Sequence, residues 1–141
     1  MTFDPSGPAV YDGIFGLPED PDAARVILVP VPWEPTTSYR RGTAGGPRNI
    51  LEASRQVDLF DRQTGKPYEA GIVMLPEDAT IVRLNEEACA RSRGIIDAGG
   101  AGEDAALLAD LERVNAMSDV LNARVEEQAL IIGWMTKIHR F

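Results

Sequence analysis

The stretch Arg25–Val31, which reads RVILVPV, decides the fold class of this sequence. Its apolar residues are continuous rather than alternating, and several are β-branched. This pattern is typical of a short strand that is covered on both faces, as in a parallel sheet. The stretch Gly71–Leu75, which reads GIVML, has the same character and predicts a second strand.

Helical patterns follow each predicted strand. Gly45-Gly46-Pro47 is expected to open the first helix, because proline suits the first helical turn. A second helix is expected to start with Asn85 as its N-cap and to end at the glycines of residues 99–102. The buried stripe of the first helix is expected to contain Ile50, Leu51, Ser54 and Val57.

A third helix is expected over about residues 103–131, because leucine and valine recur there at helical spacing. Its buried face is expected to contain Leu107, Leu111, Val114, Leu121 and Val125. The order of elements is therefore strand, loop, helix, strand, helix, helix. This order predicts the beginning of an α/β layered fold.

Length and composition exclude several classes of protein. The 141 residues predict one domain, and a single cysteine excludes a disulfide framework, which favours a reducing cytoplasm. The single histidine, His139, argues against histidine-based metal sites and Ser–His chemistry and is interpreted as an exposed tail residue. No apolar run approaches the roughly 18–20 residues that span a bilayer, and no signal peptide is recognised, so no membrane partner is expected.

Charge is distributed unevenly along the chain. Its 22 acidic and 14 basic residues give a net charge of −8, which argues against nucleic-acid binding. Residues 36–66 are the exception, with six basic and three acidic side chains. A cationic patch there could steer an anionic group, although exposed arginines are more often simply solvated.

The loop over residues 33–47 is the best candidate for a functional site, because α/β proteins place ligand sites after the carboxyl ends of parallel strands. Its stretch GTAGGP, Gly42–Pro47, could present backbone N–H groups to an anion. It is neither a Walker A sequence nor a dinucleotide fingerprint, and tight turns are the simpler interpretation of its glycines.

Elsewhere the chemistry-bearing residues have structural interpretations. Cys89 is expected to be a small buried apolar residue rather than a nucleophile. Three acidic pairs lack histidine neighbours and are interpreted as turn or cap residues: Asp20/Asp22, Asp58/Asp61 and Glu103/Asp104.

Three stretches together resemble a known family: VILVPVPW (residues 26–33), TTSYRRGTAGGP (36–47) and ILEASRQV (50–57). They are similar to the N-terminal segment of the ureohydrolases, the arginase/agmatinase/formiminoglutamase superfamily, and most of all to its agmatinase-like branch. The shared pattern is a strand ending in proline, a Thr-Ser-Tyr-Arg-x-Gly loop, and Gly-Pro before a helix. The resemblance covers about residues 3–75 and extends to the long helix.

The resemblance implies a three-layer α/β/α fold with a central parallel sheet, incomplete in this chain. Residues 1–24 would form an N-terminal arm, 25–133 a partial ureohydrolase domain, and 134–141 a tail that does not match. The implied activity is hydrolysis of a guanidino C–N bond, which releases urea from agmatine or a related compound in polyamine metabolism. Two manganese ions are the implied cofactor.

The family's metal-binding signatures are Gly-Gly-Asp-His-Ser, Asp-Ala-His-x-Asp and Ser-x-Asp-x-Asp, and none occurs in this sequence. We therefore expect a truncated or frame-disrupted ureohydrolase that is inactive alone, with no catalytic and no metal-ligating residue. One alternative is a non-catalytic protein that docks on a full-length homologue or forms a homo-oligomer. Another is a small anion-binding module built on the loop Gly42–Pro47.

Within the loop, the resemblance implies a set of residues at the substrate rim or a subunit contact: Trp33, Ser38, Tyr39, Arg40 and Gly42. Tyr39 and Arg40 match the Tyr-Arg pair of the family. A simpler interpretation is that Arg40 braces its own loop through backbone carbonyls. Glu34 is the only carboxylate of the loop that could meet a cationic substrate, so the loop alone is not expected to carry chemistry.

Overall fold

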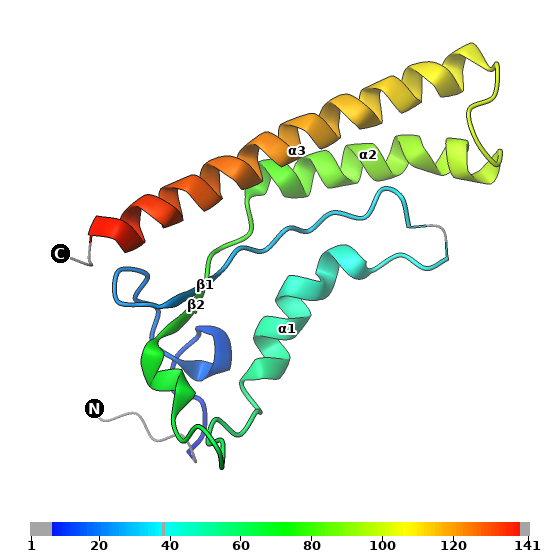
Figure 1. The fold of residues 1–141 in the computed structure, drawn as a ribbon. Helices are drawn as coiled ribbons and strands as arrows, with labels where there is room; N and C mark the ends of the chain where they lie inside the picture. Colours follow the sequence, from blue (N-terminus) through cyan, green and yellow to red (C-terminus); the bar gives the residue numbers. More distant parts are fainter. Residues whose placement is uncertain (1–6, 38, 139–141) are drawn as a thin grey trace. The chain divides into compact units, whose positions relative to one another are not determined.

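The computed structural model describes residues 7–37 and 39–138, with side chains up to residue 133. The described residues form two compact units. The first comprises residues 7–30, 47–76 and 130–138, and holds both strands and most of helix α1. The second comprises residues 31–37, 39–46 and 77–129, and holds the candidate loop, helix α2 and most of helix α3 (Figure 1).

The first unit contains a two-stranded parallel sheet. Strands β1 (Val26–Leu28) and β2 (Ile72–Met74) pair in register, with Val26 opposite Ile72. Both predicted strands and their parallel direction are thus confirmed, and the α/β fold class with them. Each strand is shorter than its apolar run, and β1 ends before Pro30, which lacks a backbone N–H to donate.

The expectation that the first strand is covered on both faces is wrong for this structure. Val26 is 44% exposed, whereas Val73 in β2 is 4% exposed. In the described part of the chain each strand has only the other as a neighbour in the sheet, and the short 3-10 helix η1 (Ile14–Gly16) contacts β2. Two strands are too few to bury both faces of a sheet.

The described part of the N-terminal arm packs on this sheet unit. The short 3-10 helix η1 (Ile14–Gly16) buries Ile14, and Leu17 directly after it is also buried. The backbone N–H of Phe15 donates a hydrogen bond of 2.8 Å to the hydroxyl of Ser54 at the end of α1. The arm therefore contributes apolar side chains to the core of the first unit.

Helix α1 (Gly46–Ser54) begins at the glycine–proline pair, as predicted, after a 3-10 turn η2 (Thr43–Gly45). Its predicted stripe is largely wrong. Ser54 is buried and Leu51 is half-buried, but Ile50 is 57% exposed and Val57 lies beyond the helix and is 52% exposed. The small sheet does not extend far enough to cover this apolar face.

Residues 55–71 connect α1 to β2. Asp61 and Gly65 exchange two backbone hydrogen bonds across the tight turn that precedes a 3-10 helix, η3 (Pro67–Ala70). Gly71 then has φ +75°, and a Cβ there would lie 3.0 Å from the backbone of Ala24. Glycine is therefore required where the chain enters β2.

Helix α2 (Ala79–Asp97) begins well before Asn85, so the prediction that Asn85 caps it is wrong. The N-cap is Asp78, whose carboxylate accepts hydrogen bonds from the N–H groups of Thr80 and Ile81. The helix ends before the glycines of residues 99–102, as predicted. The β-branched run after Asp78 is compatible with a helix because its apolar side chains pack in the second unit.

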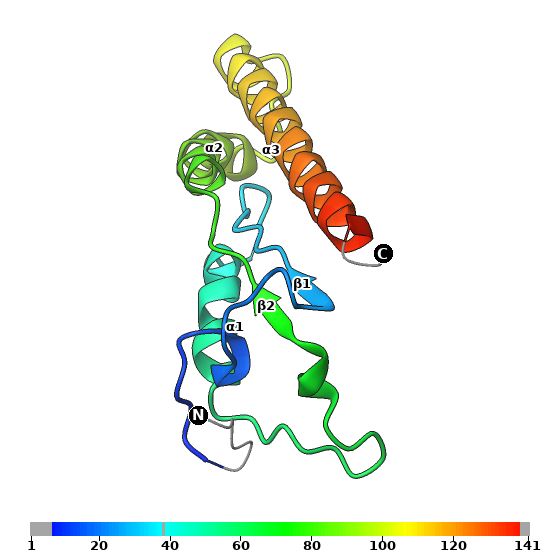
Figure 2. The ribbon, with the colours of Figure 1, turned by 90° about the vertical axis from the view of Figure 1, so that its left-hand side faces the viewer.

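Helix α3 (Ala105–Ile138) runs seven residues beyond its predicted end. In the second unit it runs back along α2 as a helical hairpin joined by a loop (Figure 1), and Figure 2, which views α2 nearly end-on, shows that the two helix axes are inclined to each other. The core of this hairpin consists of Leu84, Ala88, Val114 and Met117.

The predicted face of α3 is confirmed in part. Val114 and Leu121 are buried, and Leu107 and Val125 are half-buried. Leu111, which is 37% exposed, departs from the prediction, and Met117, which is 2% exposed, takes a central place that the prediction omitted. The boundaries predicted at residues 24/25 and 133/134 stay predictions, and His139 lies outside the described residues.

Candidate functional site

Trp33 begins the candidate loop as an anchor. Its half-buried indole packs against the hairpin core that α2 and α3 share, including Leu84 and Met117. Pro35, two residues later, is among the most deeply buried residues of the described chain. The first residues of the loop are therefore fixed on the second unit by apolar contacts.

Glu34 holds the loop closed at both ends. Its backbone N–H donates a hydrogen bond of 2.7 Å to the Oδ1 atom of Asn85 in α2. Its carboxylate accepts hydrogen bonds from the backbone N–H groups of Gly42 (2.7 Å) and Ala44 (3.0 Å). The N–H groups of Ala44 and Gly42 hold the pKa of Glu34 below its ordinary value.

This arrangement changes the interpretation of the glycine-rich stretch. The N–H groups of Gly42 and Ala44, which the sequence offers to an external anion, bind the carboxylate of Glu34 instead. Gly42 has φ +124°, a conformation that favours glycine. These hydrogen bonds also occupy the Glu34 carboxylate, which is the one carboxylate of the loop that could have bound a cationic substrate.

Tyr39 and Arg40 lie on the surface of the second unit. Tyr39 is 97% exposed, and Arg40 is also exposed. Ser38, the remaining residue of the predicted rim set, lies outside the described residues. Of the described members of that set, Trp33 is thus an anchor and Gly42 a turn residue, whereas Tyr39 and Arg40 are available to a ligand or a partner.

Arg41, rather than Arg40, braces the loop. Its Nη2 atom donates a hydrogen bond of 2.6 Å to the backbone carbonyl of Cys89 in α2. The expected brace through a backbone carbonyl therefore exists, but on the neighbouring arginine. The sequence has no signal that distinguishes the two adjacent arginines. Asn85 is a loop partner that the sequence analysis does not identify, because its position there predicts a helix cap.

The loop and α2 together line an open hollow of about 330 Å³ in the second unit. Its walls come from the exposed turn of the loop and from the last turns of α2. The lining is Thr37, Tyr39, Arg40, Arg41, Arg93, Ile96 and Asp97.

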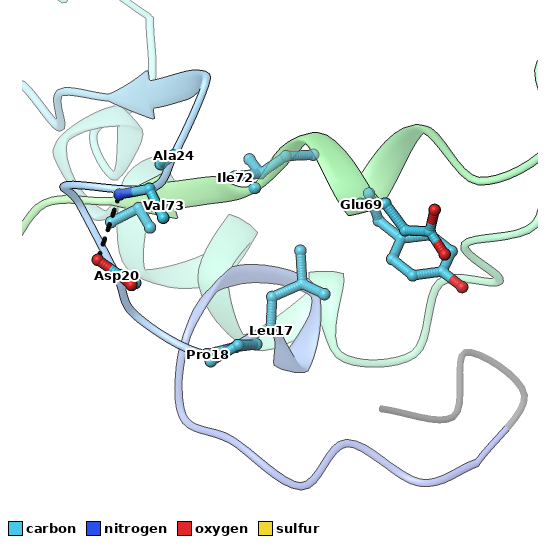
Figure 3. A pocket seen from close by; sticks show the side chains of 10 residues that line it. Leu17, Pro18, Asp20, Ala24, Glu69, Ile72 and Val73 are labelled. Atoms are coloured by element: carbon cyan, nitrogen blue, oxygen red, sulfur yellow. Dashed lines mark hydrogen bonds between the residues drawn. The ribbon is translucent and has the colours of Figure 1, made fainter. Parts of the chain in front are cut away.

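A second hollow, of about 310 Å³, lies in the first unit between the arm and β2 (Figure 3). Leu17 and Pro18 from the arm and Ile72 and Val73 from β2 give it a mostly apolar lining. The carboxylate of Asp20, one of its lining residues, accepts hydrogen bonds from the backbone of the arm itself. This hollow holds no group of side chains typical of catalysis.

Cys89 and four of the six acidic residues in the predicted pairs have the structural roles that the sequence predicted. Cys89 is 4% exposed, and burial raises the pKa of its thiol. Asp20, Asp58, Asp61 and Asp104 each accept backbone hydrogen bonds in turns or at a helix start.

The donor set does not fit a binuclear metal centre. Within residues 7–37 and 39–138, no three His, Cys, Asp or Glu side chains are arranged to hold a metal ion. The whole sequence has one histidine and one cysteine.

The described part of the chain has no helix that is long and apolar enough to cross a membrane.

Comparison with known proteins identifies the relationship. The model of the Arginase family matches residues 24–132, which is more than half of the chain. N(1)-aminopropylagmatine ureohydrolase of Synechocystis is 43% identical over 60 residues, which are 43% of this chain and 19% of the relative. The protein of the same name from a strain of Thermus thermophilus is 39% identical over 61 residues, 42% of this chain and 21% of the relative.

The matched segment thus spans about a fifth of the length of these curated relatives. No solved structure matches the chain.

Proposed function

Because the chain belongs to the arginase family, and within it to the agmatinase-like ureohydrolases, we propose that it forms the amino-terminal part of such an enzyme. The observation that carries this proposal is the family match over residues 24–132, together with the parallel pairing of β1 and β2. In this role the chain supplies the first strands of the sheet and the loop that follows β1.

The proposed reaction is hydrolysis of a guanidino C–N bond with release of urea. The substrate class is a guanidino amine, such as agmatine or N(1)-aminopropylagmatine, because the matching relatives carry the latter name. This reaction belongs to polyamine metabolism. A single cysteine favours a reducing cytoplasm as the compartment.

Catalysis by this family is attributed to two manganese ions, and the residues of this chain do not supply their ligands. We assign the ligands to residues outside this sequence. By itself, the chain is inactive and does not retain manganese.

The contribution of the chain to the site is the rim loop. Trp33 and Glu34 fix the base of this loop, while Tyr39 and Arg40 remain exposed on its turn. In an assembled enzyme these two side chains would shape the mouth of the pocket or a contact between subunits. The physical support is that a braced loop presents its exposed residues in a defined position.

A direct test uses the full chain and a full-length ureohydrolase, the Synechocystis relative, as the positive control. Urea release from agmatine and from N(1)-aminopropylagmatine is measured with and without added Mn²⁺, and metal content is measured after desalting. The relative is expected to release urea, and this chain is expected to release none and to retain no stoichiometric metal. Urea release or retained manganese would contradict the proposed inactivity.

The rim role needs a separate test in an intact agmatinase-like relative that carries the Tyr-Arg pair. The arginine that corresponds to Arg40 is replaced by alanine. A raised KM or a loss of oligomeric assembly would support the rim role. Unchanged kinetics and assembly would show that the loop is only a scaffold.

A second candidate function is docking on a full-length homologue. It is favoured by large apolar side chains that remain exposed in the first unit, among them Val26, Ile50, Val57 and Phe60. Such side chains promote association when no neighbouring element covers them. Sedimentation of the chain alone and mixed with the Synechocystis relative separates a monomer, a homo-oligomer and a mixed complex.

A further inference from the structure

Three arginine side chains line the hollow of the second unit. Arg40 and Arg41 come from the turn of the loop, and Arg93 comes from the last part of α2. Asp97 is the one carboxylate among the lining residues. The lining therefore has a net charge of about +2, in a chain whose overall charge is −8.

Neighbouring groups neutralise this positive charge only in part, and Glu34 is near enough to Arg41 for the Arg41 charge to help lower the pKa of the Glu34 carboxyl. Arg93 lies 3.7 Å from Asp97, but both side chains are 69% exposed, and ion pairs of this kind are weak. Arg41 uses one nitrogen for the carbonyl of Cys89 and keeps its other N–H groups. Arg40 makes no hydrogen bond or ion pair with the residues that the structure describes.

We propose that this hollow binds the phosphate group of a small organic phosphate. A phosphate monoester carries a charge of about −1.5 to −2 at pH 7, which matches the charge of the lining. Guanidinium groups bind phosphate oxygens in pairs of parallel hydrogen bonds. A volume of about 330 Å³ accommodates more than a bare phosphate, since small-molecule sites begin at roughly 300 Å³.

This site does not use the backbone of the glycine-rich stretch, and it shares Tyr39 and Arg40 with the proposed rim of the ureohydrolase site. The glycine-rich N–H groups are already bound to Glu34, so the anion would be held by side chains and not by the loop backbone. A lining of three arginines repels a guanidino cation, so the hollow does not bind the substrate class proposed above. Phosphate binding is measured on this chain without any ureohydrolase activity, so its failure and the failure of the ureohydrolase proposal can be told apart.

The test is calorimetric titration of the full chain with phenyl phosphate at low ionic strength. One saturable site is expected. Arg40→Ala and Arg93→Ala are each expected to weaken binding about tenfold, because each removes a charge-assisted hydrogen bond. The matched control is Arg62→Ala, which removes an exposed arginine of the first unit and is expected to leave binding unchanged.

Further titrations define the ligand. Arg40→Lys keeps the charge but not the planar fork, and is expected to bind with an intermediate affinity. Benzoate and inorganic phosphate are expected to bind more weakly than phenyl phosphate. If benzoate bound as tightly as phenyl phosphate, the site would not be specific for phosphate. If inorganic phosphate bound as tightly as phenyl phosphate, the hollow would not recognise the organic part of the ligand.

The proposal as a whole fails on either of two results. One is the absence of saturable binding to the unmodified chain. The other is equal weakening by Arg62→Ala and Arg40→Ala, which would show a general charge effect. Far-UV circular dichroism confirms that each variant keeps its helices, which is expected because Arg40 and Arg93 are exposed.

Discussion

Replacement of Asp78 is expected to weaken the α2–α3 hairpin, because this one side chain acts on both helices. The Asp78 carboxylate accepts hydrogen bonds from the first turn of α2, at 2.7 Å from Thr80 and 3.4 Å from Ile81. Its other oxygen lies 2.7 Å from the guanidinium of Arg124 in α3. Asp78 therefore caps one helix and joins it to the other.

The magnitude follows from these two roles. Loss of an N-cap costs about 1 kcal/mol. A hydrogen-bonded ion pair with a carboxylate that is only 8% exposed is worth more than a surface pair, but Arg124 is 40% exposed, so about 1 kcal/mol is appropriate. Asp78→Ala should therefore lower the free energy of unfolding by about 2 kcal/mol, the sum of the two.

Asp78→Asn separates the two roles. Asparagine caps helices about as well as aspartate but carries no charge for Arg124. This variant is expected to lose about 1 kcal/mol, half of the loss in Asp78→Ala. Asp119→Asn is the matched control, because Asp119 is an exposed acid of α3, and it should change stability by less than about 0.5 kcal/mol.

The assay is urea denaturation followed by far-UV circular dichroism, which reports the helices of the hairpin. The pKa of Asp78 lies below its ordinary value of 3.8, chiefly because of Arg124. Its ionised form therefore stabilises the fold above that value, and the contribution is lost as the pH falls through the lowered pKa. The difference between the unmodified chain and Asp78→Asn should accordingly shrink as the pH falls below 3.8 and vanish once the pH is below the lowered pKa of Asp78.

Two results would refute this reasoning. If Asp78→Ala were no more destabilising than Asp78→Asn, the carboxylate would not act as a cap. If the Asp78→Asn difference were unchanged at low pH, the effect would not come from the charge.

Two further variants test the loop and the hairpin core. Glu34→Ala should lower the free energy of unfolding by about 1 kcal/mol, because the N–H groups of Gly42 and Ala44 lose their acceptor. Glu34→Gln keeps an acceptor oxygen and should lose less. Equal losses for the two variants in urea denaturation would contradict this role of Glu34. Met117→Ala should lower the free energy of unfolding by about 2–5 kcal/mol, because the side chain is 2% exposed in the core. Its control is Leu130→Ala, which is 58% exposed and should cost less than about 0.5 kcal/mol. Similar losses for the two variants in urea denaturation would argue against the described core.

The sequence determined the elements whose signals are local. Continuous apolar runs located both strands, the pair Gly46-Pro47 located the start of α1, and the glycines of residues 99–102 located the break between the long helices. Each of these signals depends on backbone conformation or on side chains within a few residues. For the same reason, the aspartates at turns and at the start of α3 were identified correctly.

The family was also accessible from the sequence, because a strand, a loop and a helix matched in order over many residues. The family match over residues 24–132 confirms that identification. The rim role of Tyr39 and Arg40 remains a proposal.

Tertiary structure decided what local signals could not distinguish. Asp78 and Asn85 are both good helix caps. In the structure Asp78 caps α2, and Asn85 lies inside the helix and accepts a hydrogen bond from the N–H of Glu34, 51 residues away in sequence. Arg41 rather than Arg40 braces the loop because only the fold brings the carbonyl of Cys89 within reach of one of them.

Burial followed the same rule. Periodicity marks one apolar face of a helix but does not show how much of it a neighbour covers. Met117 is buried because α2 packs against α3 at that point, whereas Ile50 stays exposed because two short strands do not reach it. The grouping of three arginines around one hollow likewise required the fold, since Arg93 lies 53 residues from Arg40 and the two meet only when the loop packs on α2.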